Sequence, residues 1–182
     1  MPRHQLFEIH DSSKCPKVIR NGLTDFLQTS TDLLDTYEPI RARLLAAIAS
    51  SGSNTVVDLC SGAGGPWVKW NRKNLVNAIP VTLTDRFPNH ATIERFAEFP
   101  APALRYHPQS VDATAVPPSL PGFRTIFTAF HHFTPAQGKA IIDDAIKNGQ
   151  GIGIFEFTSR TLPATLGMLL TPVGVWLFTP FG

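Results

Sequence analysis

The residues that follow the apolar run 55–59 (TVVDL) could bring the backbone close to a ligand. This run contains Asp58, and a turn of small residues comes directly after it: Cys60, Ser61, Gly62, Ala63, Gly64 and Gly65. Glycine lets a chain turn sharply and approach a ligand closely, because it carries no Cβ atom. A tight turn without a ligand would show the same pattern, so the turn by itself is a weak sign of binding.

Acidic residues follow the next two apolar runs. Asp85 ends the run 81–85 (VTLTD), where its carboxylate could accept hydrogen bonds from the hydroxyls of a ribose. Asp112 follows the run 104–107 (LRYH), where a carboxylate could accept a proton from an adenine amino group. Each acid alone is more often a solvated loop residue. Together with the glycine turn, the two acids predict a site for a nucleotide-like ligand.

Aromatic residues and histidines follow a fourth apolar run, 125–129 (TIFTA). An imidazole titrates near neutral pH and can act as a general base, so His131 and His132 are the candidate catalytic residues. The other interpretation is that one histidine packs against the sheet and its neighbour caps the next helix. Weaker candidates for acid–base chemistry are His10, Asp11 and Glu156.

The glycine turn lacks the patterns that bind dinucleotides and triphosphates. A dinucleotide fingerprint would need a glycine at position 67, where Trp67 stands. The sequence also contains no GKS or GKT, as a phosphate-binding P-loop would require. Nicotinamide and triphosphate cofactors are therefore disfavoured.

Alternating strands and helices must position these residues. We predict strands at 55–59, 81–85, 104–107, 125–129 and 151–157, and helices at 18–50, 66–78 and 89–98. A further helix begins with Thr134 as N-cap and Gln137 as its capping-box partner, and it ends at Asn148 and Gly149. This alternation is typical of an α/β fold with a doubly wound, mostly parallel sheet and helices on both faces. In such a sheet the ligand lies outside the carboxyl ends of the strands, where the turn, the acids and the histidines fall.

Four ordered motifs carry a resemblance to a known family. VVDLCSGAGG resembles the first motif of class I S-adenosylmethionine-dependent methyltransferases, with Cys60 in place of its first glycine. LTDRFPN resembles their acidic ribose motif, VDAT their adenine motif, and FHHF the motif after their fourth strand. More loosely, FEFTSR resembles the end of their fifth strand, so the similarity covers residues 55–160.

The resemblance implies a Rossmann-like fold, S-adenosylmethionine as cofactor, and methyl transfer as the reaction. It also implies a set of cofactor-binding residues: Asp58, Cys60, Gly62, Ala63, Gly64, Asp85, Arg86, Asp112, Ala113 and Phe130. His131 and His132 lie where the family has pocket residues. That fold has seven strands, so we expect either a chain truncated after the fifth strand or an atypical short form of the fold.

Three segments are predicted: an N-terminal helical cap at 1–54, the cofactor-binding core at 55–160, and an apolar tail at 161–182. The tail contains no charged residue and is long enough to span a membrane, but its prolines would break a simple spanning helix. Two interpretations remain open for the tail. It is either part of a buried or partner-covered surface, or a segment that contacts a membrane interface.

Charge and cysteine content exclude further classes of partner and cofactor. The net charge of +2 is small and no run of Lys or Arg occurs, so we expect no nucleic-acid partner. Two cysteines are too few for a disulfide framework or a zinc cluster, so we expect no metal site. The first residues are polar and do not resemble a signal peptide, so we expect a cytoplasmic protein. Membrane association through the apolar tail is left open.

The acceptor expected from these features is a small molecule or a lipid-like compound. A cytosine methyltransferase would need a nucleophilic cysteine after the fourth strand, and the chain has no cysteine beyond Cys60. A non-catalytic module that binds the cofactor or a partner protein is the alternative. The sequence does not decide the oligomeric state.

Overall fold

The computed structural model describes residues 15–16, 22, 24, 28–31, 35–76, 79–88, 90–97 and 103–156 of the chain. The predicted apolar tail at 161–182 and the weaker candidates His10 and Asp11 lie outside these residues. Within the described part, no helix is both long and apolar enough to cross a membrane.

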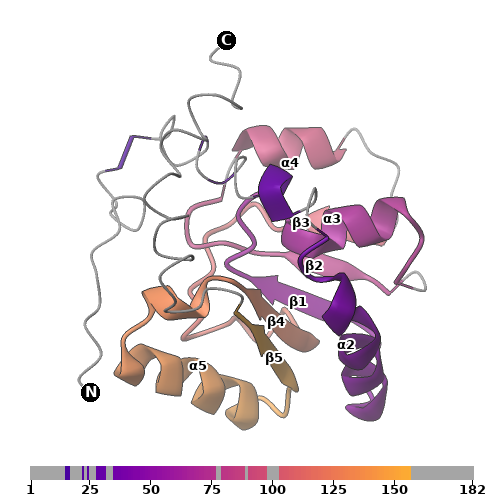
Figure 1. The fold of residues 1–182 in the computed structure, drawn as a ribbon. Coiled ribbons are helices and arrows are strands. Elements are labelled where there is room, and N and C mark those ends of the chain that lie inside the picture. The colour runs from indigo at the N-terminus through magenta and orange to yellow at the C-terminus, as the bar shows by residue number, and fades with distance from the viewer. Residues whose placement is uncertain are drawn as a thin grey trace, which may run out of the picture.

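Five parallel strands form a single sheet in the order β3-β2-β1-β4-β5 (Figure 1). Their bounds are Val56–Leu59 for β1, Val81–Leu83 for β2, Leu104–Tyr106 for β3, Phe123–Phe127 for β4 and Ile152–Phe155 for β5. The strand order reverses between β1 and β4, which is where an open parallel sheet can hold a ligand. This arrangement confirms the predicted α/β fold with a parallel sheet.

Helices cover both faces of the sheet. The bounds are Glu38–Ser50 for α2, Gly65–Arg72 for α3, His90–Ala97 for α4 and Pro135–Lys147 for α5, with a short 3-10 helix, η2, at Phe130–His132. Figure 1 shows α5 on the opposite side of the sheet from α3. The capping box predicted for α5 is present, because the Thr134 side chain accepts from the N–H of Gln137 while the Gln137 side chain reaches back.

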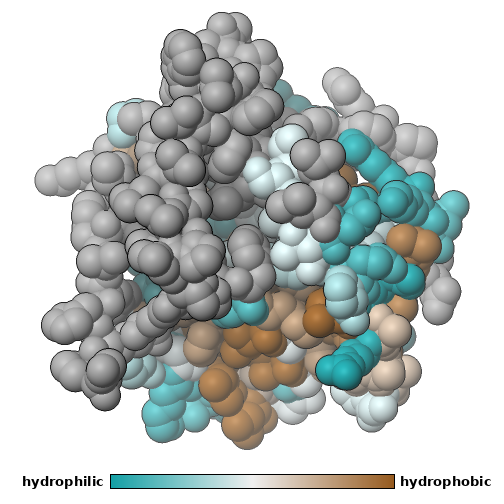
Figure 2. Space-filling view, in the orientation of Figure 1, coloured by the Kyte–Doolittle hydropathy of each residue, from teal (hydrophilic) through white to brown (hydrophobic). Residues whose placement is uncertain are grey.

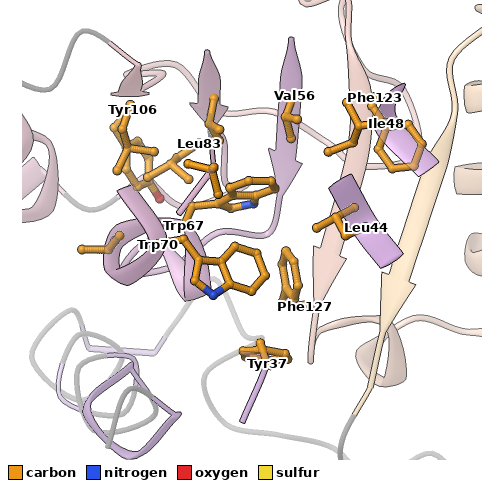
Figure 3. Packing of buried hydrophobic residues seen from close by; sticks show 14 residues of the cluster. Tyr37, Leu44, Ile48, Val56, Trp67, Trp70, Leu83, Tyr106, Phe123 and Phe127 are labelled. Atoms are coloured by element: carbon orange, nitrogen blue, oxygen red, sulfur yellow. The ribbon is translucent and has the colours of Figure 1, made fainter. Parts of the chain in front are cut away.

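Each face of the sheet has its own hydrophobic core, because successive strand side chains point to opposite sides. Val56 faces the core beneath α2 and α3, while Val57 faces the core beneath α5. Aromatic rings dominate the first core (Figure 3). Phe127 lies edge-on to Tyr37, Trp67 and Trp70, with ring centroids 4.9, 6.2 and 6.0 Å away. Such edge-to-face pairs add to the free energy gained from burial.

Apolar side chains are exposed on the side of the molecule formed by α5 and β5. Ile142 and Ile146 of α5 are the exposed large hydrophobic residues among those that the structure describes, and all of β5 is only half-buried. Figure 2 shows this as a hydrophobic area in the lower part of the view.

Several predicted boundaries were wrong. The helix expected over 66–78 ends as α3 at Arg72. The helix expected over 18–50 is interrupted, because Asp35 has a φ of +49° and α2 begins only at Glu38, with Pro39 in its first turn. The fourth strand starts two residues earlier than predicted and stops at Phe127, because Thr128 has a φ of +45°. The start of this strand was missed because it contains Arg124, and a buried arginine is not expected in an apolar run.

Candidate functional site

The glycine turn lies at the carboxyl end of β1, at the point where the strand order reverses. Cys60 has a φ of +58° and Gly62 a φ of +51°, so both occupy the left-handed region that favours glycine. Thr128, at the matching end of β4, also has a positive φ. Two non-glycine residues in this region on neighbouring strand ends are a strain that folded proteins tend to retain at functional sites.

Asp58 stabilises the turn from beneath. Asp58 is predicted to bind the cofactor, but only 1% of its surface is exposed. Its carboxylate accepts hydrogen bonds from the Ser61 hydroxyl at 2.6 Å, from Nε1 of Trp67 at 3.1 Å and from the Thr125 hydroxyl. Asp58 therefore ties the turn to α3 and β4, and its side chain faces the core rather than the edge of the sheet.

Burial raises the pKa of Asp58 to about 7, although hydrogen bonds from Ser61, Thr125 and Trp67 act in the opposite direction. The ordinary value is 3.8, so between about pH 4 and pH 7 the folded state binds more protons than the unfolded chain. We therefore expect Asp58 to make the free energy of unfolding fall as the pH rises through this window, and to have no further effect above it. Urea denaturation at about pH 5 and about pH 8 should show a weaker fall in Asp58→Asn than in the wild type.

Asp143→Asn, at an exposed position of α5, is the matched control for this measurement and should keep the wild-type dependence. An equal pH dependence in Asp58→Asn and the wild type would contradict the role of this buried carboxyl.

Asp85 links the end of β2 to the glycine turn. Its Oδ2 accepts a hydrogen bond from the N–H of Gly62 at 2.9 Å, and its Oδ1 accepts one from the N–H of Phe87 at 2.8 Å. The hydroxyl of Tyr106, at the end of β3, donates to the carbonyl of Gly62 at 3.0 Å. Tyr106 was not predicted, because its hydrogen bond joins residues far apart in the sequence. The ends of three strands are thus held together at Gly62.

Asp112 lies beside Asp85 at the same edge. The N–H of Val111 donates to the carbonyl of Asp85 at 2.9 Å, which places the two loops side by side. Both hydrogen bonds from Thr114 go to Oδ1 of Asp112, and they lower its pKa below the ordinary value; nearby Arg86 acts in the same direction. Oδ2 of Asp112 has no hydrogen-bond partner among the described residues, so an ionised oxygen is available to a donor at this edge.

His131 forms a dyad with Glu156, which follows β5. Nδ1 of His131 lies 2.9 Å from Oε2 of Glu156, and Oε1 accepts from the backbone N–H of Phe130 at 2.6 Å. Burial by itself raises the pKa of Glu156, but the hydrogen bonds from His131 and Phe130 outweigh it and hold the pKa below its ordinary value. A carboxylate at Nδ1 fixes the tautomer of the ring and leaves Nε2 as the basic nitrogen.

The two predicted histidines thus have different surroundings. The ring of His132 lies with its centroid 4.0 Å from that of His131, whereas Nδ1 of His131 itself contacts Glu156. Phe130 directs its ring toward α5, since a Cβ added to Gly138 would lie 2.9 Å from it. The structure therefore brings Glu156 to His131, while Phe130 packs against a helix.

Ala63, Ala113 and Gly64, which are also predicted to bind the cofactor, are tightly packed against neighbouring residues. Ala63 and Ala113 are buried, and Ala113 belongs to the core beneath α5. A Cβ added to Gly64 would lie 2.5 Å from Cγ2 of Val68, so this position needs a glycine for packing as well as for its φ of +112°.

The N-terminal segment contacts the glycine turn. Nε2 of Gln28 donates to the carbonyl of Gly65 at 2.9 Å. A Cβ added to Gly62 would lie 2.7 Å from Cγ2 of Thr24. Residues predicted to belong to a helical cap therefore lie against the turn, where the sequence analysis places the cofactor.

Comparison with models of known protein families and with curated proteins found no match to this chain.

Proposed function

We propose that this protein is an S-adenosylmethionine-dependent methyltransferase that acts on a small-molecule or lipid-like acceptor. The observation that carries the proposal is the link between Asp85 and Gly62 at the point where the strand order reverses. It puts an acidic group and a close-approach backbone turn at one edge of a parallel sheet, which suits a ligand with a ribose. The absence of a dinucleotide or P-loop pattern favours this cofactor over its rivals.

The residues at this edge fit an adenosine group. Each oxygen of Asp85 accepts one hydrogen bond in the described structure, so each retains a lone pair for a ribose hydroxyl. Oδ2 of Asp112 could accept a hydrogen bond from the adenine amino group, with Arg86 nearby. When bound, S-adenosylmethionine would supply an electrophilic methyl group on its sulfonium.

His131 is the best candidate for the base. With Nδ1 engaged by Glu156, Nε2 is the nitrogen that would take the proton from an acceptor N–H or O–H. S-adenosylmethionine would supply the methyl group that the acceptor gains, and His131 would hold the proton that the acceptor loses. Glu156 would orient the ring and stabilise the imidazolium, as a positioning residue.

We expect Asp85→Ala to weaken S-adenosylmethionine binding by about 1–3 kcal/mol, because the ribose hydroxyls would lose a hydrogen-bond acceptor. Calorimetric titration of the full chain measures this effect. Asp143→Asn should bind as the wild type does, since Asp143 lies on the exposed face of α5.

Asp85 also holds Gly62, so circular dichroism and thermal unfolding must show that the variant is folded. Wild-type affinity in a folded Asp85→Ala protein would remove Asp85 from the site. A wild-type chain that binds no S-adenosylmethionine would refute the proposed cofactor.

A further inference from the structure

A hollow of about 230 Å³ opens beside the dyad, between the start of α2 and the carboxyl end of β5. It is lined by Thr36, Tyr37, Ile40, Ile154, Phe155 and Glu156. The volume is below the roughly 300–1,000 Å³ of pockets for drug-sized ligands, so an occupant must be smaller. The wall is mixed, because apolar side chains such as Ile40 and Phe155 alternate with the polar groups of Thr36 and Glu156. Small-molecule sites likewise combine apolar side chains with a few polar groups.

The aromatic part of this wall is preformed. The ring of Phe155 stacks on Phe127 with centroids 5.0 Å apart and planes inclined by 17°. Tyr37 lies edge-on to Phe127 (Figure 3), and its hydroxyl is hydrogen-bonded to the Thr128 hydroxyl at 2.5 Å. Because packing and a hydrogen bond fix these rings, a ligand would not need to order them.

The charge of the residues that line the hollow determines which ligands it favours. Among the described residues that line the hollow, Glu156 is the charged one, and none of them is a lysine, arginine or histidine. The same carboxylate contacts Nδ1 of His131, so the hollow and the candidate base share one residue. An anionic ligand would meet the like charge of the Glu156 carboxylate, whereas an N–H or O–H group would find an acceptor there.

We propose that this hollow binds the methyl acceptor, and that the acceptor is a small apolar compound with an amine or hydroxyl group rather than an anion. Its apolar part lies against Tyr37, Ile40 and Phe155, and its donor group points toward Glu156. The identification of the ligand as a methyl acceptor rests on the proposed function. The preference for an amine or alcohol over an anion depends on the hollow alone.

The test uses three probes that share a phenyl ring and differ in charge: phenethylamine, 2-phenylethanol and phenylacetate. Their binding to the full chain is followed by NMR without cofactor. We expect the amine and the alcohol to bind at least about tenfold more tightly than the anion. Glu156→Gln should reduce this preference to within about threefold, because the repulsive charge is gone.

Two variants are designed to fill the hollow, so that one can still be tested if the other misfolds. Ile40→Trp and Thr36→Trp should each weaken the two binding probes at least about tenfold. Ile146→Trp places the same side chain on the exposed face of α5 and should change nothing.

Equal binding of all three probes, wild-type binding by the filled variants, or no binding at all would overturn the proposal. Because no cofactor is present, these outcomes are independent of the S-adenosylmethionine titration. A hollow that binds amines in a protein without cofactor affinity would refute the proposed function and leave the ligand preference standing.

Discussion

Replacing Asp144 with Asn is expected to lower the free energy of unfolding by about 3–5 kcal/mol. Asp144 of α5 contacts the guanidinium of Arg124 on β4 at 2.5 Å, and the Arg124 side chain is only 2% exposed. Nε of Arg124 is buried without a hydrogen-bond partner, so Asp144 carries most of the compensation for this charge. Without it, a charge would remain buried between the sheet and α5.

The adjacent residue provides a matched control. Asp143 pairs with Lys139 on the exposed face of the same helix, and Asp143→Asn should cost about 0.5 kcal/mol or less. Urea denaturation of both variants measures the difference. Similar losses in the two variants would contradict the assignment of Arg124–Asp144 as a buried pair. The double variant Arg124→Met/Asp144→Leu should recover much of the loss, because it removes both charges.

Replacing His131 with Ala is expected to lower methyl transfer by about 10²–10⁴, the usual contribution of a positioned base. S-adenosylmethionine affinity should stay within about threefold, because the groups proposed to bind the cofactor are Asp85 and Asp112. His132→Ala is the matched control, and it should lose less than about tenfold, since Glu156 contacts the ring of His131.

The measurement is a single-turnover rate with an active acceptor, beside a calorimetric titration of the same variants. A larger loss in His132→Ala than in His131→Ala would reverse the assignment of the two histidines. Wild-type rates in both variants would leave alignment of the acceptor as the source of catalysis.

The sequence by itself predicted the features that depend on neighbouring residues. The β-branched runs at 55–59 and 81–85 predicted two of the parallel strands, and the capping box at Thr134 predicted the start of α5. The same local signals predicted the glycine turn and the acids at the strand ends. These features follow from backbone preferences and apolar periodicity within a few residues, which a sequence states directly.

The tertiary structure decided which of these residues meet. Asp58 looked like a ligand-facing acid, but Trp67 and Thr125 draw its carboxylate into the core. Arg124 looked unsuited to a strand until α5 supplied Asp144. Each of these contacts joins different elements, so the order and packing of the strands determine it and the local sequence does not.

The His131–Glu156 pair shows the same difference between what the sequence predicts and what the tertiary structure decides. The sequence offered two adjacent histidines without a reason to choose between them, and it ranked Glu156 lower. Because β4 and β5 lie side by side, Glu156 at the end of β5 reaches the start of η2 and contacts His131. The sequence determined that imidazoles would follow the fourth strand. Only the pairing of two strands decided which imidazole receives a carboxylate, because that pairing brings together groups far apart in the chain.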